Sequence, residues 1–398
     1  MEKNFRELNR FLMRQRAEGK IKVVSMAQPV NPATIERLPT GVDSIDAILH
    51  GGLPRGQLSI ICGPTHTGKS SLASLVLARS LSNSDKYALM FAGEKTEGEV
   101  LFDVARQMAG SRMRKIGNNE YCIPDSDFAA IRQVMGMRLT TISMLERNRL
   151  VPRNRRLSYI QSTIEEAAAA GVEIIVIDPL MMLVAAGVGD PEIRANTDIE
   201  RQVLIGTWLE DIAREYNIWV VLVAHYRKGT ASDVTGPEMI AGSSAVPNCA
   251  GTIIEYNRFS VSEVRDNAAL EYQRRVKIWK NRGFGTLDLI GQTCIFDAPS
   301  TRIGSNPAGQ DGSQGYTADG DCADANFRWW ERLQDGTAYD PFADPYDPPT
   351  NMFLSEIDAE LAAIDAAANS GADIDEDRLA ALLAANDRLR GIGQGVQA

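Results

Sequence analysis

The sequence has few cysteines and no long apolar run, and each absence argues against a class of protein. Its 398 residues include five widely spaced cysteines that form no Cys-x-x-Cys pair, a pattern that indicates neither a disulfide framework nor a zinc site. No apolar run reaches the roughly 18 residues that cross a bilayer. The N-terminus, MEKNFRELNRFLMRQRAEGK, lacks the hydrophobic core of a signal peptide. We therefore expect a cytoplasmic protein with no membrane partner.

Positive charge is scarce near the C-terminus. Residues 301–398 hold 18 acidic and 6 basic side chains, and the last lysine of the chain is Lys280. The whole chain has 42 basic and 52 acidic residues, so residues 1–300 keep 36 basic and 34 acidic ones. The net charge of −10 therefore comes from a tail, and it does not argue against nucleic-acid binding by the rest of the chain.

Apolar and helical segments alternate from about residue 39 to 300, which predicts an α/β fold with a mainly parallel central sheet. Buried strands are expected at Leu58–Cys62, Ala88–Ala92, Glu173–Asp178, Trp219–Ala224 and Thr252–Tyr256, with further strands at Val276–Trp279, Thr286–Ile290 and Thr293–Phe296. Four parts are expected: a helix and linker (1–37), the α/β body (38–303), a Gly- and Pro-rich linker (304–350) and an acidic, partly helical tail (351–398).

Two local patterns predict packing outside the strands. Thr197 and Glu200 form a capping box that opens a helix. We expect this helix to bury the side chains of Ile199, Val203, Trp208 and Ile212. Phe327, Trp329 and Trp330 are expected to anchor the tail on the body.

The strongest motif is a phosphate-binding loop that follows the first buried strand. It reads Gly63, Pro64, Thr65, His66, Thr67, Gly68, Lys69 and Ser70, and an apolar helix begins there. Glycines allow backbone N–H groups to surround a phosphate, and the helix N-terminus adds a positive dipole. Lys69 would neutralise the β- and γ-phosphates of ATP or another nucleotide, and Ser70 would bind Mg²⁺, with Ser71 beside it.

Two acidic residues are candidates for the rest of this site. Asp178 ends the strand Glu173–Asp178 and is expected to hold Mg²⁺ with Ser70. Glu94, just after the strand Ala88–Ala92, is the favoured base for positioning water, because it would lie at the same edge of the sheet. Glu97 and Glu99 are alternatives.

Further motifs resemble the RecA-family ATPases. The segment from Leu38 to Gly56 resembles the start of the ATPase cores of DnaB, RadA and KaiC-type proteins. The stretches Val220–Lys228, Met239–Arg258 and Val276–Gly285 are similar to DnaB-like hexameric replicative helicases, above all to the helicase half of phage primase-helicases and to Twinkle-type helicases. The resemblance implies a RecA-like P-loop NTPase core over about residues 38–303, in the host cytoplasm if the source is viral.

The resemblance also assigns roles to residues. It implies that His225 senses the γ-phosphate, that Arg282 with Lys280 reaches into the neighbouring subunit's site, and that Arg258 lies with the nucleotide-binding residues. It places two DNA-contacting loops at about 183–197 and 226–244. Candidate DNA contacts there are Arg194, Arg227, Lys228, Gly242 and Ser243.

Together these features predict a homo-hexameric, ATP-dependent DNA helicase that moves on single-stranded DNA during DNA replication. Primase, polymerase, single-strand-binding protein or a loader would be its further partners. A RadA/RecA-type recombination ATPase and a KaiC-like regulatory ATPase are the alternatives.

Overall fold

The computed structural model describes residues 10, 11, 14, 31–118, 120–144, 156–227, 236–241, 245–306, 321–333 and 361–364. The chain divides into two units, Met1–Glu36 and Arg37–Ala398. The first unit contains a short 3-10 helix, Pro32–Thr34, capped by the side chain of Asn31. The helix expected near the N-terminus lies outside the described residues except for Arg10, Phe11 and Arg14, which are helical.

The second unit is built on a nine-stranded sheet with the order β13-β12-β11-β10-β3-β9-β8-β4-β7. The strands from β10 to β7 are parallel, whereas β11, β12 and β13 are each antiparallel to their neighbours. The bounds are β3 Gln57–Gly63, β4 Ala88–Ala92, β7 Leu139–Ser143, β8 Ile174–Asp178, β9 Trp219–His225, β10 Thr252–Asn257, β11 Gln273–Asn281, β12 Asp288–Phe296 and β13 Ile303–Ser305. The prediction of an α/β fold with a mainly parallel sheet is confirmed.

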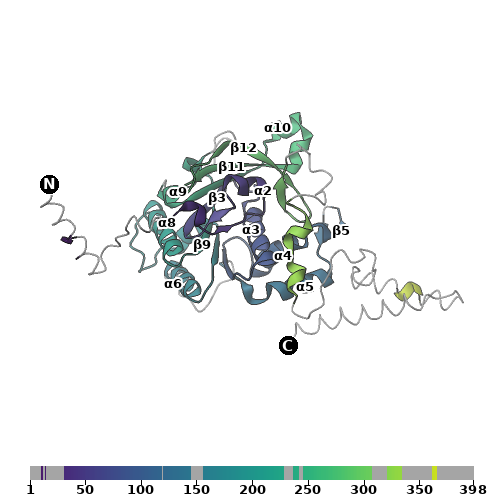
Figure 1. Cartoon of the computed structure of the whole chain (residues 1–398), viewed down its shortest axis with the longest axis horizontal. Helices are drawn as coiled ribbons and strands as arrows, with labels where there is room; N and C mark the ends of the chain where they lie inside the picture. Colours follow the sequence, from purple (N-terminus) through teal and green to yellow (C-terminus); the bar gives the residue numbers. More distant parts are fainter. Residues whose placement is uncertain are drawn as a thin grey trace. The chain divides into compact units, whose positions relative to one another are not determined.

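Helices cover both faces of this sheet because its central strands are apolar on both sides. Figure 1 shows α6 and α8 on one side of β3 and β9, and α3, α4 and α5 on the other. Successive residues of β3 enter opposite cores: Leu58 and Ile60 face one cluster, and Ile61 faces the other. The helices are α2 Asp43–Ile48, α3 Lys69–Asn83, α4 Glu97–Ala109, α5 Asp125–Met135, α6 Arg156–Ala169, α7 Leu180–Ala186, α8 Asp198–Glu215, α9 Ala245–Cys249 and α10 Val261–Asp266.

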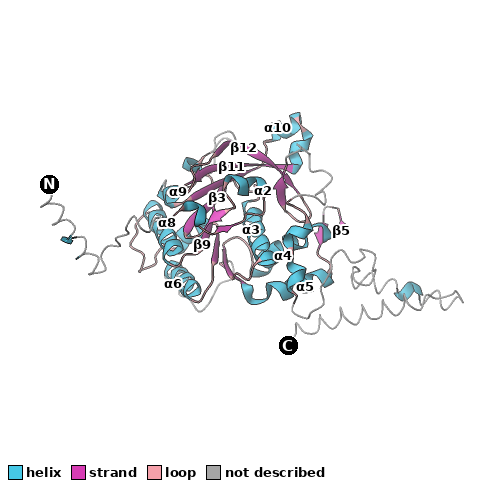
Figure 2. Ribbon diagram, viewed as in Figure 1, coloured by secondary structure: helices cyan, strands magenta, loops and turns pink. Residues whose placement is uncertain are grey.

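Smaller elements complete the second unit. Two short antiparallel pairs lie outside the main sheet, β1 Arg37–Leu38 with β2 Leu53–Pro54, and β5 Arg114–Gly117 with β6 Glu120–Cys122. Figure 2 shows that β11 and β12 are long strands, with α10 lying beyond one end of them. No helix among the described residues is both long and apolar enough to span a bilayer.

The sheet departs from the sequence prediction at two strands. Edge strand β7 was not expected, because Leu139-Thr-Thr-Ile-Ser143 is short and partly polar. The two runs expected at 286–290 and 293–296 form one strand, β12, with a bulge at Gly291. Gly291 adopts φ 95°, and its N–H donates to Asp288 Oδ1 over 2.9 Å. A bulge of this kind adds residues to a strand without ending it.

Helix α8 begins as predicted, but one side of its first turns is exposed. Thr197 and Glu200 form the capping box, so that prediction is confirmed. The predicted burial of Ile199 and Val203 is wrong, because their side chains are 60% and 38% exposed. The helix packs on the sheet mainly through its later residues: Ile205, Leu209 and Ile212 are buried, and Trp208 is partly buried against the same core.

A buried arginine fixes the segment that follows β13. Arg302 is fully buried, and its guanidinium donates to the carbonyl oxygens of Gln107, Met108 and Cys322 at 2.6, 3.0 and 2.9 Å. It also pairs with Asp324 Oδ1 at 2.7 Å and lies 3.8 Å from the centre of the Phe327 ring. One side chain therefore joins α4 to residues 322–327.

Residues 321–333 pack on the body although they fall inside the range expected as a linker. Phe327 and Trp329 are buried in the core that contains α3 and α4, and Trp330 is partly buried beside them, which confirms their predicted anchoring role. Trp329 Nε1 donates to the carbonyl of Met108 over 3.1 Å. Of the tail helices expected after residue 350, the described residues 361–364 are helical and the rest lie outside the description.

Replacing Arg302 by methionine should cost about 3–5 kcal/mol of unfolding free energy, because Asp324 and three carbonyls would be left buried without their donor. Guanidinium unfolding monitored by circular dichroism measures this loss. The control is Arg328→Ala, which removes an exposed ion pair with Glu331 and should change stability by about 0–1 kcal/mol. Equal losses in the two variants would contradict the anchoring role of Arg302.

Candidate functional site

A glycine-rich loop joins β3 to α3 at the edge of the sheet where the parallel strands end. Gly63 has φ 151°, and a Cβ there would lie 2.3 Å from the carbonyl oxygen of Tyr256 on β10. Gly68 has φ 104°, and a Cβ there would lie 3.0 Å from Cε1 of the Tyr256 ring. Only glycine fits both the backbone conformation and the close contact at these two positions.

The remaining residues of the loop surround its centre. Lys69 is the first residue of α3, and its Nζ donates to the carbonyl of Pro64. Thr67 Oγ1 donates to the same carbonyl over 3.0 Å. Thr65 and His66 are exposed, whereas Ser70 is half-buried. Half-buried Ser71 fixes α4 to α3, because its carbonyl accepts a hydrogen bond of 2.6 Å from Gln107 Nε2.

Asp178 lies at the end of β8, paired in register with Ala92 of β4. Its carboxylate is hydrogen-bonded to the side chain of Ser70. Burial raises the pKa of Asp178, while the Ser70 hydrogen bond and the nearby Lys95 and His225 oppose that rise. A buried carboxylate and a hydroxyl in contact form a hard oxygen donor set of the kind that Mg²⁺ prefers.

Glu94 and His225 meet beside Asp178. His225 ends β9 and pairs in register with Gly63, and its Nε2 lies 3.4 Å from Glu94 Oε1. Burial and the nearby Lys69 lower the pKa of His225, although Glu94 and Asp178 oppose them. The imidazole is therefore neutral at pH 7. Glu94 itself is 69% exposed, so its carboxylate faces solvent, where a water molecule can reach it.

Glu97 and Glu99 are engaged elsewhere. Glu97 Oε1 accepts a hydrogen bond of 3.3 Å from the backbone N–H of Ser143. Glu99 forms the capping box of α4 with Thr96, and these hydrogen bonds lower the pKa of Glu99. Of the three glutamates, Glu94 is the one that lines the pocket next to Asp178.

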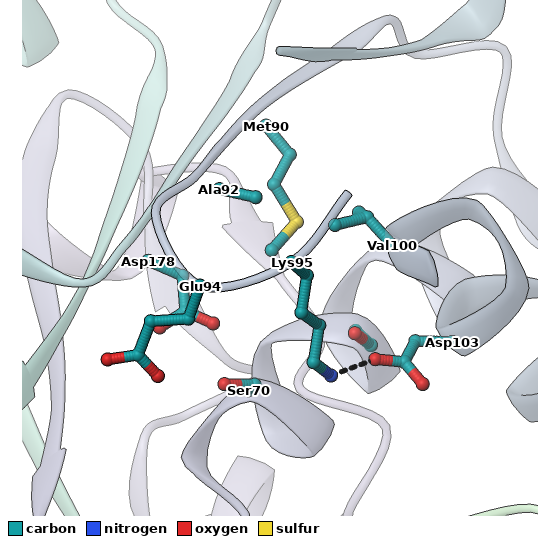
Figure 3. Close-up of a pocket in the computed structure, with 9 residues that line it drawn as sticks. Ser70, Met90, Ala92, Glu94, Lys95, Val100, Asp103 and Asp178 are labelled. Atoms are coloured by element: carbon teal, nitrogen blue, oxygen red, sulfur yellow. Dashed lines mark hydrogen bonds and ion pairs between the residues drawn. The ribbon is translucent and has the colours of Figure 1, made fainter. Parts of the chain in front are cut away.

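A small pocket joins these groups and adds a lysine that the sequence analysis did not select. Figure 3 shows Ser70, Glu94 and Asp178 on one side of the pocket, with Lys95 extending toward Asp103. Lys95 Nζ is bound by Asp103, and Arg106 Nη2 also lies 3.0 Å from that carboxylate. The one local signal for Lys95 was its position directly after Glu94, a position common to many solvated lysines.

Arg258 lies at the same edge of the sheet as the loop. Tyr256 of β10 packs against Gly63 and Gly68, and Arg258 follows it by two residues with an exposed side chain. Its backbone N–H donates to Asn257 Oδ1 over 2.9 Å. The predicted nucleotide-binding residues are therefore assembled from β3, α3, β8 and the end of β10.

Lys280 and Arg282 lie at the opposite edge of the sheet. Thr252 of β10 pairs with Ser59, in the first half of β3, and with Asn281 of β11. The four residues from Ser59 to Gly63 span about 13 Å, so Arg282 lies near the start of β3 and not near the loop at its end. The structure does not bring these two residues to their own chain's Lys69.

The side chains of Lys280 and Arg282 are held by neighbouring elements of their own chain. Lys280 Nζ donates to the carbonyls of Pro247 and Asn248, both at 3.0 Å. Arg282 donates to the carbonyl of Asn248 at 2.9 Å and pairs with Glu210 of α8 at 3.2 Å. Arg282 remains 47% exposed.

Only part of the predicted DNA-binding set lies within the described residues. Arg194 and Arg227 are described, and both are exposed; Lys228, Gly242 and Ser243 are outside the description. The first of the two expected loops is partly helical, because α7 extends to Ala186. The second begins and ends on β9: Arg227 N–H donates to the carbonyl of Met239, and Ala241 N–H to that of His225.

The charge of Lys69 should make phosphate binding depend on pH. Burial lowers the pKa of Lys69 to about 8, with Asp178, Cys62 and Glu94 opposing, so the free protein loses this proton above pH 8. A bound polyphosphate favours the ammonium form. ATP affinity should therefore fall as pH rises above 8, approaching about tenfold per pH unit.

A fluorescent ATP analogue titrated between pH 7.5 and 9.5 measures this effect. The control is Lys69→Arg, whose guanidinium stays protonated throughout the range, so its affinity should be weaker but flat. A wild-type affinity that does not change between pH 7.5 and 9.5 would rule out this role of Lys69.

Comparison with known proteins places the chain in a family. The profile of the AAA domain family AAA_25 matches residues 27–231, just over half of the chain. Among curated proteins, DNA repair and recombination protein RadB of Methanobrevibacter smithii is 26% identical over 245 residues, 61% of this chain and 86% of RadB. DNA repair protein RadA of Mycolicibacterium smegmatis is 35% identical over 71 residues, 18% of this chain and only 15% of RadA.

Solved structures with this fold include helicase domains. The isolated ATPase domain of one DnaB-like helicase superposes with a TM-score of 0.51 at 16% identity, covering 69% of this chain and 93% of that domain. A DnaB-like replicative helicase, solved in a study of its interactions with primase, gives a TM-score of 0.52 at 15% identity, covering 68% of this chain and 62% of that one. At these identities the likeness shows the fold alone. The chain therefore belongs to the AAA_25 family of AAA domains, with a P-loop ATPase core that has the fold of the DnaB-like helicases.

Proposed function

We propose that this chain is an ATP-driven DNA helicase that assembles into a homo-hexameric ring and moves on single-stranded DNA. The observation that carries the proposal is the position of Lys280 and Arg282, at the edge of the sheet opposite their own phosphate-binding loop. An arginine that cannot reach its own site can complete the site of a neighbouring copy. Hydrolysis then requires subunits arranged head to tail, as in a ring.

The residues at the loop edge divide the ATPase chemistry among them. The loop Gly63–Ser70 with Ser71 and Arg258 binds the nucleotide, and Lys69 neutralises its phosphates. Ser70 and Asp178, already in contact, would hold Mg²⁺, which supplies neutralisation of the phosphate charge. Glu94 orients and deprotonates the attacking water, and neutral His225, 3.4 Å from Glu94, reports the presence of the γ-phosphate to β9.

The exposed arginines Arg194 and Arg227 contact the DNA backbone, and Lys228, Gly242 and Ser243 complete this surface. Contacts of this type are independent of sequence and weaken with salt. The fold likeness to a DnaB-like replicative helicase that interacts with primase supports a role in DNA replication, in a phage or its host. Primase, polymerase, single-strand-binding protein or a loader are the corresponding partners.

A recombination ATPase of the RadA/RecA type is the second candidate. It is favoured by the match to RadB, which covers 86% of that protein. Such an ATPase would also use an arginine in trans, so the two candidates differ in what the assembly does to DNA.

A forked duplex with one labelled strand separates the two candidates. We expect single-stranded DNA to stimulate ATP hydrolysis and the protein to release the labelled strand only when ATP is present. The variant Lys69→Ala serves as the control without hydrolysis. An assembled protein that hydrolyses ATP, never opens forks of either tail polarity and instead pairs homologous strands would replace the helicase by the recombination ATPase.

Changing Arg282 to alanine should lower kcat for ATP hydrolysis by about 10³-fold or more while leaving assembly intact in sedimentation velocity. The matched control is Arg214→Ala, because Arg214 pairs with the same Glu210 at 2.6 Å but is not placed in the site. It should retain hydrolysis.

Mixing two inactive proteins tests whether Arg282 acts in trans. Subunits with Arg282→Ala keep an intact phosphate-binding loop, and subunits with Lys69→Ala keep an intact Arg282. We expect the mixture to recover part of the wild-type rate, because a Lys69→Ala subunit can complete the site of its Arg282→Ala neighbour. A mixture as inactive as its components would show that the two residues do not act across an interface.

A further inference from the structure

A buried carboxylate lies inside the sheet, away from the phosphate-binding loop. Glu255 of β10 is 1% exposed and pairs in register with Cys62 of β3 and Lys277 of β11. One oxygen, Oε2, accepts two hydrogen bonds, from the hydroxyl of Tyr226 at 2.5 Å and from Trp279 Nε1 at 2.8 Å. The three side chains come from three consecutive parts of the chain that the sheet brings together.

The stability of the fold does not explain this carboxylate. A buried charge is costly to desolvate, and an apolar replacement of similar volume is often as stable or more so. The second oxygen, Oε1, accepts no hydrogen bond from any of the described residues, which adds to the cost. Glu255 is therefore better explained by what its two donors reach than by the free energy of folding.

The Tyr226 end reaches the base of the second DNA-contacting loop. Tyr226 follows His225 directly, and its hydroxyl accepts a hydrogen bond of 3.2 Å from the backbone N–H of Gly236. Its backbone forms an isolated antiparallel bridge with Ile240. The chain thus leaves β9 at Arg227 and returns onto Tyr226, so that this one residue contacts both ends of the segment between them.

The Trp279 end reaches the strand that carries Lys280 and Arg282. Trp279 immediately precedes Lys280 on β11, and its ring is partly buried against the core beneath α8. Any shift of β11 along β10 changes the distance from Trp279 Nε1 to Glu255. The same shift moves Lys280 and Arg282, which follow on the same strand.

We propose that Glu255 is a positioning residue that couples the base of the DNA-contacting loop to the strand bearing Arg282. Three hydrogen bonds, from Gly236 N–H to Tyr226, from Tyr226 to Glu255 and from Trp279 to Glu255, form the link. Hydrogen bonds to a charged acceptor in a water-excluded interior are strong and directional, so a displacement at one end changes the geometry at the other. DNA in the loop thereby adjusts the arginine that serves the neighbouring ATPase site.

The surroundings keep the link in one protonation state. Burial raises the pKa of the Tyr226 hydroxyl, as do the nearby Cys62 and Glu255, so the hydroxyl remains a donor at physiological pH. The Cys62 thiol lies 3.9 Å from the same hydroxyl, and burial raises its pKa to about 12. Neither neighbour competes with Glu255 by ionising.

The inference rests on the proposed function, and steady-state ATP hydrolysis with and without an oligo-dT strand tests it. Tyr226→Phe removes one hydroxyl, and Glu255→Gln removes the charge with little change of shape. We expect kcat and KM for ATP without DNA to stay within about twofold of wild type. The stimulation by DNA should fall about tenfold, the effect of losing a hydrogen bond to a charged group. The double variant should be no worse than the worse single variant, because both changes break one link.

The control is Trp329→Phe, which removes another buried indole hydrogen bond, from Trp329 Nε1 to Met108, on the opposite face of the sheet. Its DNA stimulation should equal that of wild type. Stimulated wild type with equally stimulated Tyr226→Phe and Glu255→Gln variants would overturn the inference alone, as would a parallel loss of hydrolysis without DNA. A wild type that DNA does not stimulate would overturn the proposed function as well.

Discussion

Parallel pairing of β3, β9, β8 and β4 determines where the polar groups of the ATPase site lie. Parallel strands end at a common edge, and the register aligns Gly63 with His225 and Ala92 with Asp178. Glu94 follows Ala92 by two residues and so reaches both partners. The loop could not turn at this edge without the close approach of Gly63 and Gly68 to Tyr256. Backbone pairing alone therefore accounts for most of the site's geometry.

The change of direction after β10 separates two chemical tasks. Strand β11 runs antiparallel to β10, so it carries Lys280 and Arg282 away from the loop edge to the other end of the sheet. A fully parallel sheet would end this strand beside the loop. The buried contact between Glu255 and Trp279 crosses the same pair of strands, which makes the β10–β11 boundary the place where the two edges can influence each other.

The sequence predicted those features that depend on neighbours along the chain. The five central strands, the loop at Gly63–Ser70 and the capping box at Thr197 each follow from a short stretch of residues. Burial on α8 did not, because Ile199 and Val203 fit the helical period but lie in the first turns, on a side of the helix that stays exposed. Strand β7 is short and partly polar, and it forms only because β4 presents a free edge to it. The contacts of Glu255 and Arg302 join residues far apart in sequence, so no local pattern indicates them.

The segment between β13 and residue 321 has both of its ends fixed to one carboxylate. Ser305 donates to Asp321 through its backbone N–H at 2.9 Å and its hydroxyl at 2.6 Å, and Asp43 N–H donates to the same oxygen at 2.9 Å. Doubling the length of a flexible loop between fixed ends costs only about 0.6 kcal/mol. Residues 307–320 are therefore a natural place for insertions, whether evolution adds a sequence there or an experimenter adds a label, because the chain re-enters the fold at Asp321 whatever its length between.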